Sequence, residues 1–317
     1  MNLVKASIRL SNVYLESSFQ MAPVFSIILP TFNRAHTLGR AMESVIKQSY
    51  TDWELWVIDD GSTDKTKELV LSFNSPRVHY VYQENMGRST ARNNGISLAN
   101  GKYIAFLDSD DCYDINFLES VYRRCYDDYV GMVVCSVRFG LNSEAKTLVP
   151  PIIKENESAQ EYVFKQPIGT PRMVVHKELF KKYRFDQSLH FGEDRDLWVR
   201  MATEFPLRLA RQAIFIEIEH AHRSINLDVN PWRTTKTLES LKIRGVISKV
   251  SSHVYNSTLA KEYLSACRIS LKSGSRKNAI RAILASLYHY PYSWKFKVII
   301  LVYIVCFKKT NSILRMF

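Results

Sequence analysis

The sequence has few cysteines, no apolar run long enough to cross a membrane, and no acidic residues near its end. The five cysteines are an odd number without C-x-x-C or metal-ligand spacing, so neither a disulfide framework nor a zinc site is expected. The apolar run Val298–Phe307 is far shorter than the about 20 residues that a spanning helix needs. Residues 1–20 lack the apolar core of a signal peptide, so we expect a cytoplasmic protein.

The positive charge is concentrated at one end. The formal charge of the 317-residue chain is +12, and residues 263–317 contain basic side chains without a single Asp or Glu. A basic segment that also holds an apolar run is typical of membrane-surface elements rather than of phosphate-backbone grooves. We therefore expect no nucleic-acid partner, and a peripheral position on the inner face of the cell membrane. The alternative is a core helix of a C-terminal helical region.

Short apolar strands alternate with helical patterns over residues 24–137. This alternation predicts an α/β fold with a mainly parallel sheet and helices on both faces. Strands are expected at residues 24–29, 53–58, 78–82, 103–107 and 132–137, and helices at residues 38–48, 65–73, 89–99 and 115–126. Further helices are expected at residues 237–251, 259–273, 276–288 and 292–307.

Two carboxylates follow the apolar strand at residues 103–107, namely Asp108 and Asp110. A hard cation such as Mg²⁺ or Mn²⁺ prefers oxygen ligands and commonly uses only one or two protein carboxylates. We expect Asp110 to hold the metal and Asp108 to accept hydrogen bonds from ribose hydroxyls. An acidic turn that caps the next helix would look the same, so this motif alone leaves both interpretations open.

Polar residues follow the carboxyl ends of four expected strands. Open α/β sheets bind ligands beyond this edge, so the coincidence predicts a nucleoside-diphosphate site. Asp60 could accept from the imide N–H of a uracil, and Arg92, in the first turns of a helix, could neutralise phosphate. Turn chemistry, helix caps or a surface ion pair would explain each motif separately. The residues expected to contact the donor are Pro30, Thr31, Asn33, Arg34, Asp60, Arg92, Asp108 and Ser109.

Four ordered segments resemble the motifs of family 2 inverting glycosyltransferases. They are SIILPTFNR at residues 26–34, DDGSTD at 59–64, N-x-G-x-x-x-A-R-N at 85–93 and DSDD at 108–111. The similarity covers about residues 24–218 and implies a nucleotide-sugar donor. It also implies a GT-A fold, with a mixed, mainly parallel sheet. The expected division is an N-terminal extension at 1–21, a GT-A domain at 22–224 and a basic helical region at 225–317, with Met21 as a plausible start.

The resemblance places a general base in the segment GEDRDLW at residues 192–198, and Asp194 is the expected residue. On a helix that begins near Glu193, Asp194 would share the inward face of Leu197 and Trp198. Burial would raise its pKa and the helix N-terminus would lower it, so the sequence does not fix the pKa. Asp194 would take a proton from an acceptor hydroxyl, giving inversion in one displacement. Without the resemblance, these acids would pass for ordinary first-turn carboxylates.

The acceptor side is less well defined. His222, in EHAHRS, is a weak candidate for the metal, and a loop histidine without a catalytic role is the alternative. His176 stands where many relatives carry an arginine, which leaves acceptor contacts there open. The basic helical tail resembles that of enzymes of bacterial surface-polysaccharide assembly, and implies a glycan or a polyisoprenoid-linked acceptor.

Two other functions share part of this pattern. A nucleotidyltransferase would share the sheet and the metal, but it would carry a Gly-rich loop after the first strand, and residues 30–33 contain no glycine. A non-catalytic membrane-surface protein could use the basic tail. It would have no need for carboxylates at Asp60, Asp108, Asp110 and Asp194.

Overall fold

The computed structural model describes residues 22–125, 127, 129–218, 230–292, 297, 298, 300, 301 and 304. The expected extension at residues 1–21 and the candidate metal ligand His222 lie outside the described residues. The four cysteines that the structure describes are buried and not joined in disulfides.

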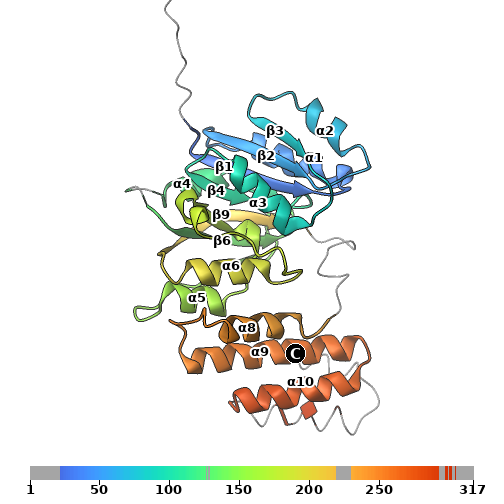
Figure 1. Cartoon of the computed structure of the whole chain (residues 1–317), viewed down its shortest axis with the longest axis vertical. Coiled ribbons are helices and arrows are strands. Elements are labelled where there is room, and N and C mark those ends of the chain that lie inside the picture. The colour runs from blue at the N-terminus through green and yellow to red at the C-terminus, as the bar shows by residue number, and fades with distance from the viewer. Residues whose placement is uncertain are drawn as a thin grey trace, which may run out of the picture.

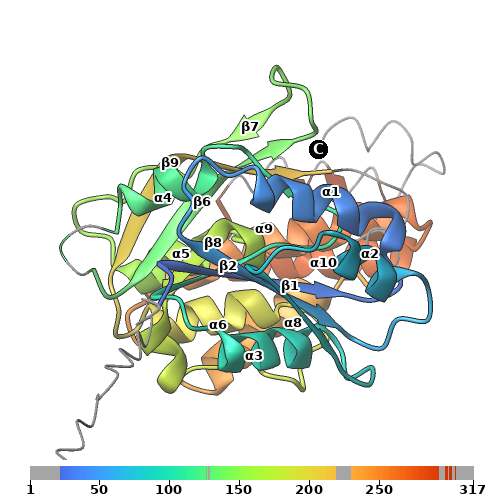
Figure 2. The same cartoon turned by 90° about the horizontal axis from the view of Figure 1, so that it is seen from above.

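The first half of the domain is a parallel sheet with strand order β3-β2-β1-β4. All residues of β4 are buried, because helices cover both faces of the sheet. In Figure 2, α1 and α2 lie on one side of these strands and α3 on the other. The strands are β1 (Phe25–Thr31), β2 (Trp53–Asp59), β3 (Val78–Tyr82) and β4 (Tyr103–Phe106), and the helices are α1 (Ala35–Ile46), α2 (Thr66–Ser72) and α3 (Arg88–Leu98).

The second half makes the sheet mixed, with the full order β3-β2-β1-β4-β8-β6-β9-β5 and β7 paired to β6. Strand β8 runs antiparallel to both β4 and β6, so β6 points the same way as β4, and β9 is parallel to β6. The elements are β5 (Cys112–Tyr113), α4 (Phe117–Tyr122), β6 (Met132–Phe139), β7 (Thr147–Leu148), α5 (Ala159–Lys165), the 3-10 turn Thr170–Arg172, β8 (Met173–His176), the 3-10 turn Lys177–Lys181, α6 (Glu193–Met201) and β9 (Leu207–Glu217).

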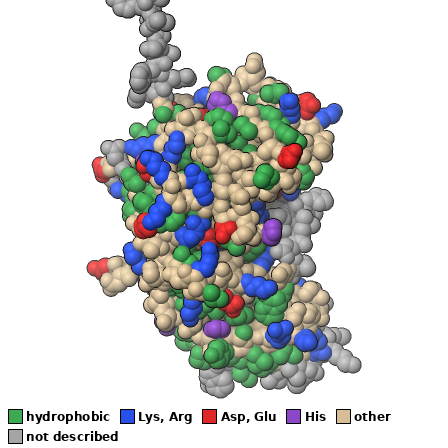
Figure 3. All heavy atoms as spheres, viewed as in Figure 1, with side chains coloured by type: hydrophobic (Ala, Val, Ile, Leu, Met, Phe, Trp, Pro, Cys, Tyr) green, Lys and Arg blue, Asp and Glu red, His purple; other side chains and the backbone are tan. Residues whose placement is uncertain are grey.

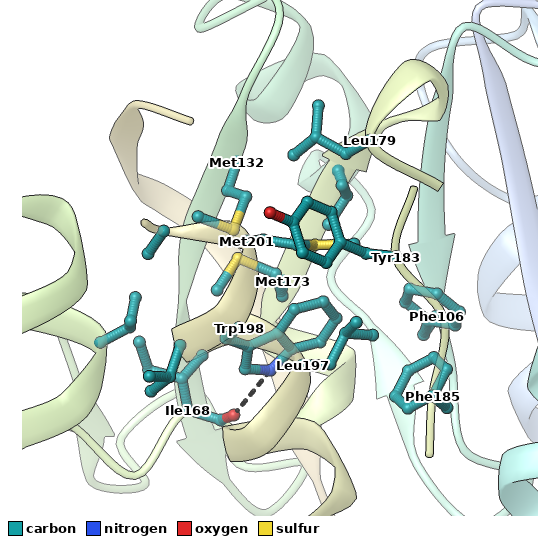
Figure 4. Packing of buried hydrophobic residues seen from close by; sticks show 14 of the residues in the cluster. Phe106, Met132, Ile168, Met173, Leu179, Tyr183, Phe185, Leu197, Trp198 and Met201 are labelled. Atoms are coloured by element: carbon teal, nitrogen blue, oxygen red, sulfur yellow. Dashed lines mark hydrogen bonds between the residues drawn. The ribbon is translucent and has the colours of Figure 1, made fainter. Parts of the chain in front are cut away.

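One hydrophobic core joins α6 to the sheet. Trp198 of α6 packs edge-on against Phe185, at 5.9 Å between ring centroids, and Phe106 of β4 lies beside both rings (Figure 4). The Trp198 indole N–H donates to the Ile168 carbonyl at 3.2 Å. The burial of this large residue fixes α6 against the sheet, and with it the acidic start of the helix.

The C-terminal helices stack beneath α5 and α6 (Figure 1). Leu238 and Leu241 of α8, with Tyr255 and Leu259 of α9, belong to the same core as Trp198. Helices α8 and α9 therefore share a hydrophobic core with α6. These helices are α8 (Arg233–Ile243), α9 (Ser252–Lys272) and α10 (Arg276–His289).

Two of the expected tail helices have wrong boundaries. The helix expected at residues 237–251 ends at Ile243, because Gly245 takes a left-handed φ of 68° and breaks it. The next helix begins at Ser252 rather than at 259, since the Ser251 hydroxyl caps it by accepting from the Val254 N–H.

The apolar run near the end is partly described. Ile300 and Ile304 are fully buried against apolar side chains of α9 and α10. For these two residues the packing matches the core alternative. In the part of the chain that the structure describes, no helix combines the length and apolar character that crossing a membrane requires. The face in Figure 3 shows basic side chains over much of its height, with fewer acidic ones among them.

Candidate active site

A cleft of about 480 Å³ opens at the carboxyl ends of β1, β2 and β4. Every residue expected to contact the donor lines it, except Asn33, and so does the expected metal ligand Asp110. Four further residues of the lining were predicted only as parts of motifs or loops, without a role of their own: Phe32, Asn85, Gly87 and Arg88. The lining consists of Pro30, Thr31, Phe32, Arg34, Asp60, Asn85, Gly87, Arg88, Arg92, Asp108, Ser109 and Asp110.

Asn33 supports the cleft rather than lining it. Its backbone takes a left-handed φ of 52°, which asparagine tolerates better than most residues. Its side-chain oxygen accepts from the Thr63 N–H at 2.8 Å, and its own N–H donates to the Ser62 hydroxyl at 2.8 Å. These bonds tie the loop after β1 to the loop after β2.

Asp60 is buried and organises the loop before α3. Its carboxylate accepts from the Gln83 amide at 2.7 Å and from the Met86 and Gly87 N–H groups at 2.9 Å each. Oδ2 takes one of these three bonds, which leaves it capacity for a further donor such as a base N–H. The neighbouring Gly61 has a φ of 90°, and a Cβ there would come within 2.9 Å of the Asn85 backbone nitrogen, so only glycine fits.

Arg92 joins the donor side of the cleft to α6. One side of its guanidinium contacts Asp108 at 3.0 Å, and the other contacts Glu193 at 3.0 Å. Burial lowers the pKa of Arg92, but the Asp108 and Glu193 charges outweigh it and raise the pKa above its ordinary value. Arg92 therefore stays charged inside the protein, and it braces the carboxylate that the sequence assigned to the ribose.

The carboxylates of the cleft suit a hard divalent cation. Asp108 and Asp110 are half-buried carboxylates that face the same cleft. Within the described residues, no group of three or more acidic, histidine or cysteine side chains is assembled to hold a metal ion. Mg²⁺ and Mn²⁺ do not need such a group when a diphosphate supplies the remaining oxygens.

Asp194 lies at the start of α6, as the sequence predicted. Burial, and after it the adjacent Glu193 charge, raise its pKa to about 6 against the opposing effects of the hydrogen bond from the Arg195 N–H and of the Arg92 and Arg88 charges. A carboxylate with such a pKa can accept a proton near neutral pH. The sequence predicted that one face of α6 would be buried, but in the structure nearly all sides of this helix are buried. Asp194 and Arg200 are the members of this helix that retain partial exposure.

Glu193 is the functional candidate that sequence reasoning missed. Its side chain is 5% exposed and contacts two arginines, Arg92 and the cleft residue Arg88. The Glu-Asp pair was recognised in the sequence, but only its second member received a role. The motif of residues 85–93 also held both arginines, and only Arg92 was singled out.

The C-terminal helices also hold α6. Asp196, fully buried, pairs with Arg200 at 2.7 Å and with Arg244 beyond α8. Arg195 pairs with Glu262 of α9 at 3.0 Å. Such buried pairs are costly to break, since one partner would be left unpaired.

Gly192, just before α6, fits tightly against α8. It takes a φ of 74°, and a Cβ there would lie 2.6 Å from the Thr237 hydroxyl. The beginning of α6 is therefore set by α8 as well as by the sheet.

His176 is a structural residue in this fold. Its side chain is buried at the end of β8, where Nδ1 accepts from the Glu178 N–H at 3.2 Å. Its ring also packs edge-on against Tyr103 at 5.2 Å between centroids. These contacts make it a cap for the following turn.

The sequence matches one protein family and several curated relatives. The family model described as glycosyl transferase family 2 matches residues 26–184. WcaA of Escherichia coli K12, which carries the name of a colanic acid biosynthesis glycosyl transferase, is 29% identical over 64% of this chain and 75% of its own length. WfgD of Escherichia coli, named as a UDP-Glc:alpha-D-GlcNAc-diphosphoundecaprenol beta-1,3-glucosyltransferase, is 45% identical over 30% of this chain and 38% of its own length. The chain spans about 30% of the length of further curated relatives.

Solved structures share the fold. TarS of S. aureus in complex with UDP-GlcNAc superposes with a TM-score of 0.65, at 17% identity, over 92% of this chain and 89% of that chain. The mannosyltransferase PcManGT of Pyrobaculum calidifontis, in complex with GDP-Man and Mn²⁺, gives a TM-score of 0.56 at 16% identity with the same coverage. At these identities the likeness shows a GT-A type architecture and nothing finer.

Proposed function

The chain belongs to glycosyl transferase family 2, and from that premise we propose that it transfers a sugar from a nucleoside-diphosphate donor to an acceptor hydroxyl with inversion. The observation that carries the proposal is the link from the cleft to the start of α6 through Arg92, which contacts Asp108 in the cleft lining and Glu193 next to Asp194. Asp108 and Asp110 line the cleft, and Asp194, which is not among the lining residues, has a pKa of about 6.

The donor is proposed to be a UDP-sugar. Asp60 keeps acceptor capacity toward a base N–H, and Asp108, braced by Arg92, can accept from ribose hydroxyls. TarS, a structural neighbour, was solved in complex with UDP-GlcNAc. The positively charged Arg34 and Arg88 in the cleft lining suit a diphosphate.

A divalent ion is proposed as the cofactor, held by Asp110 with help from donor phosphates. Bound there, Mg²⁺ or Mn²⁺ would supply charge stabilisation for the departing diphosphate. PcManGT, a neighbour in fold, was solved with Mn²⁺ and a nucleotide sugar. His222 stays a weak candidate for a further ligand.

Asp194 is proposed to act as the general base. Its carboxylate would take the proton of the acceptor hydroxyl while that oxygen attacks the anomeric carbon from the face opposite the diphosphate. A single displacement of this kind inverts the configuration. The core around Trp198 fixes α6 and so limits the movement of the carboxylate.

The acceptor is proposed to be a glycan or polyisoprenoid-linked sugar of bacterial surface-polysaccharide synthesis. WcaA and WfgD carry names of polysaccharide and lipid-linked glycosyl transfer. A lipid-linked acceptor would require a position at the inner face of the cell membrane, which suits the basic tail.

The test is release of nucleoside diphosphate from a panel of UDP-, GDP- and dTDP-sugars, with Mn²⁺ or with EDTA, and with lipid-linked or glycan acceptors. We expect release with one donor class, only with metal, and accelerated by an acceptor. Release of pyrophosphate instead would indicate a nucleotidyltransferase. No release with any donor would contradict the proposal.

A further inference from the structure

Glu193 occupies an unusual place for a carboxylate. Its side chain is 5% exposed and lies between two guanidinium groups of α3. Arg88 contacts it at 2.7 Å through Nε and at 3.1 Å through Nη2, and Arg92 contacts it at 3.0 Å. A buried carboxylate is costly unless it is paired and hydrogen-bonded, and this one is paired twice.

The same contacts fix Arg92. Its Nη1 is held by Glu193 and its Nη2 by Asp108, so both ends of the planar guanidinium are anchored. A planar fork held at two points cannot rotate without losing one contact. Glu193 thereby determines the orientation in which Arg92 meets the donor-side carboxylate.

The next residue along α6 is Asp194. The positive charges of Arg92 and Arg88 act on Asp194 and favour its ionised form, whereas the Glu193 charge opposes them. If Glu193 were neutral, both arginines would keep their charge and lose their nearest counterion on α6. Asp194 would then be the neighbouring carboxylate available to them, and it would become a weaker base.

Two more arginines near the start of α6, Arg195 and Arg233, have contacts of their own. Arg195 pairs with Glu262 of α9. Arg233 of α8 lies over the Phe191 ring at 4.3 Å. In the described part of the chain, the charges that act most on Asp194 are therefore those of its neighbour on α6 and of the two arginines on α3.

We propose that Glu193 is a positioning residue with two effects. It holds Arg92 on Asp108, and it keeps Arg88 and Arg92 from pairing with the carboxylate of the base Asp194. The inference rests on the proposed function, in which Asp194 accepts the acceptor proton. It assigns to the first member of the Glu-Asp pair a role that acts through other side chains rather than on the substrate.

The test compares the pH dependence of kcat in Glu193→Gln and Arg88→Gln. In Glu193→Gln the acid limb should move down by about one pH unit, because a negative charge beside the base is lost. Its plateau kcat should fall about 3- to 10-fold while the donor KM changes less than about threefold, since a weaker base accepts the proton less readily. In Arg88→Gln the acid limb should move up, because a positive charge is lost.

Glu157→Gln is the matched control. Glu157 is as buried as Glu193, with a side chain 6% exposed, and pairs with Lys165 outside the cleft. Its pH profile should equal that of the wild type. If Glu193→Gln fails to fold by circular dichroism, Glu193→Asp and the upward shift in Arg88→Gln carry the test.

An unchanged acid limb in both Glu193→Gln and Arg88→Gln would overturn the proposal, as would shifts of the same sign in both. A wild-type protein that releases no nucleoside diphosphate from any donor would instead defeat the proposed function, so the two failures can be told apart.

Discussion

Replacing Asp194 by asparagine should make the protein more stable at neutral pH while removing its activity. The substitution keeps the size of the side chain and removes a charge that the fold disfavours. Loss of a positioned base should lower turnover by about 10² to 10⁴, with donor binding retained. Catalysis and stability are thus expected to move in opposite directions at a single residue.

The size of the stability gain follows from the pKa of Asp194. That pKa rises from an ordinary 3.8 to about 6, and each unit corresponds to about 1.4 kcal/mol. Between these two values the folded protein binds more protons at this residue than the unfolded chain does. The charge therefore costs stability above pH 6, and the cost is relieved as the pH falls from 6 toward 4. Because Asp194 keeps some exposure, we expect a gain of about 1–3 kcal/mol at pH 7.5.

The assay is urea unfolding followed by tryptophan fluorescence at pH 7.5 and pH 5.0. The advantage of Asp194→Asn over the wild type should narrow by about 1 kcal/mol at the lower pH, where the native carboxyl is largely protonated. Asp186→Asn is the control of opposite sign, because hydrogen bonds from Ser188 hold the pKa of Asp186 below its ordinary value. That variant should lose stability at pH 7.5. An Asp194→Asn variant that is equally destabilised at both pH values would refute the reasoning.

Three further substitutions test other parts of the structure. Asp110→Asn should abolish metal-dependent turnover without changing the fold, because it removes a ligand charge at constant volume, and near wild-type turnover with Mn²⁺ would sink the metal assignment. Gly192→Ala should destabilise the protein by about 1–3 kcal/mol in urea unfolding, since the new Cβ would collide with the Thr237 side chain and the backbone φ is left-handed. An unchanged urea midpoint would contradict the close fit of Gly192 against α8. Ile300→Ala should lower the free energy of unfolding by about 2–4 kcal/mol in the same assay, because the residue is fully buried. Unchanged stability together with weaker co-sedimentation on anionic vesicles would instead favour a membrane anchor.

The strands and the rim of the cleft could be predicted because they depend on local pattern. Apolar runs bounded by Gly, Asn and Asp predicted β1 to β4 and β6, and the carboxyl-edge rule then brought Asp60 and Asp110 to one cleft. The order of β8, β6 and β9 could not be predicted in this way, because it depends on pairings between distant segments, antiparallel for β8 and parallel for β9.

Side-chain partnerships were harder to predict than positions. The contacts of Glu193 with Arg88 and Arg92 join residues about a hundred positions apart, and sequence spacing carries no information on them. Asn33 was placed at the right loop, but its side chain turns toward Thr63 instead of the cleft. The pKa of Asp194 depended on two opposing effects that only the surrounding structure could weigh.

Calorimetric titration with UDP, GDP and dTDP measures whether the cleft binds a nucleoside diphosphate through a metal. We expect binding of UDP in the presence of Mn²⁺, loss of that binding in EDTA, and a similar loss in Asp110→Asn. Asp114→Asn, which changes a carboxylate outside the cleft lining, should bind like the wild type. Binding of UDP that is equally tight in EDTA and in Asp110→Asn, or no binding of any of the three nucleotides, would contradict a metal-dependent nucleotide site in this cleft.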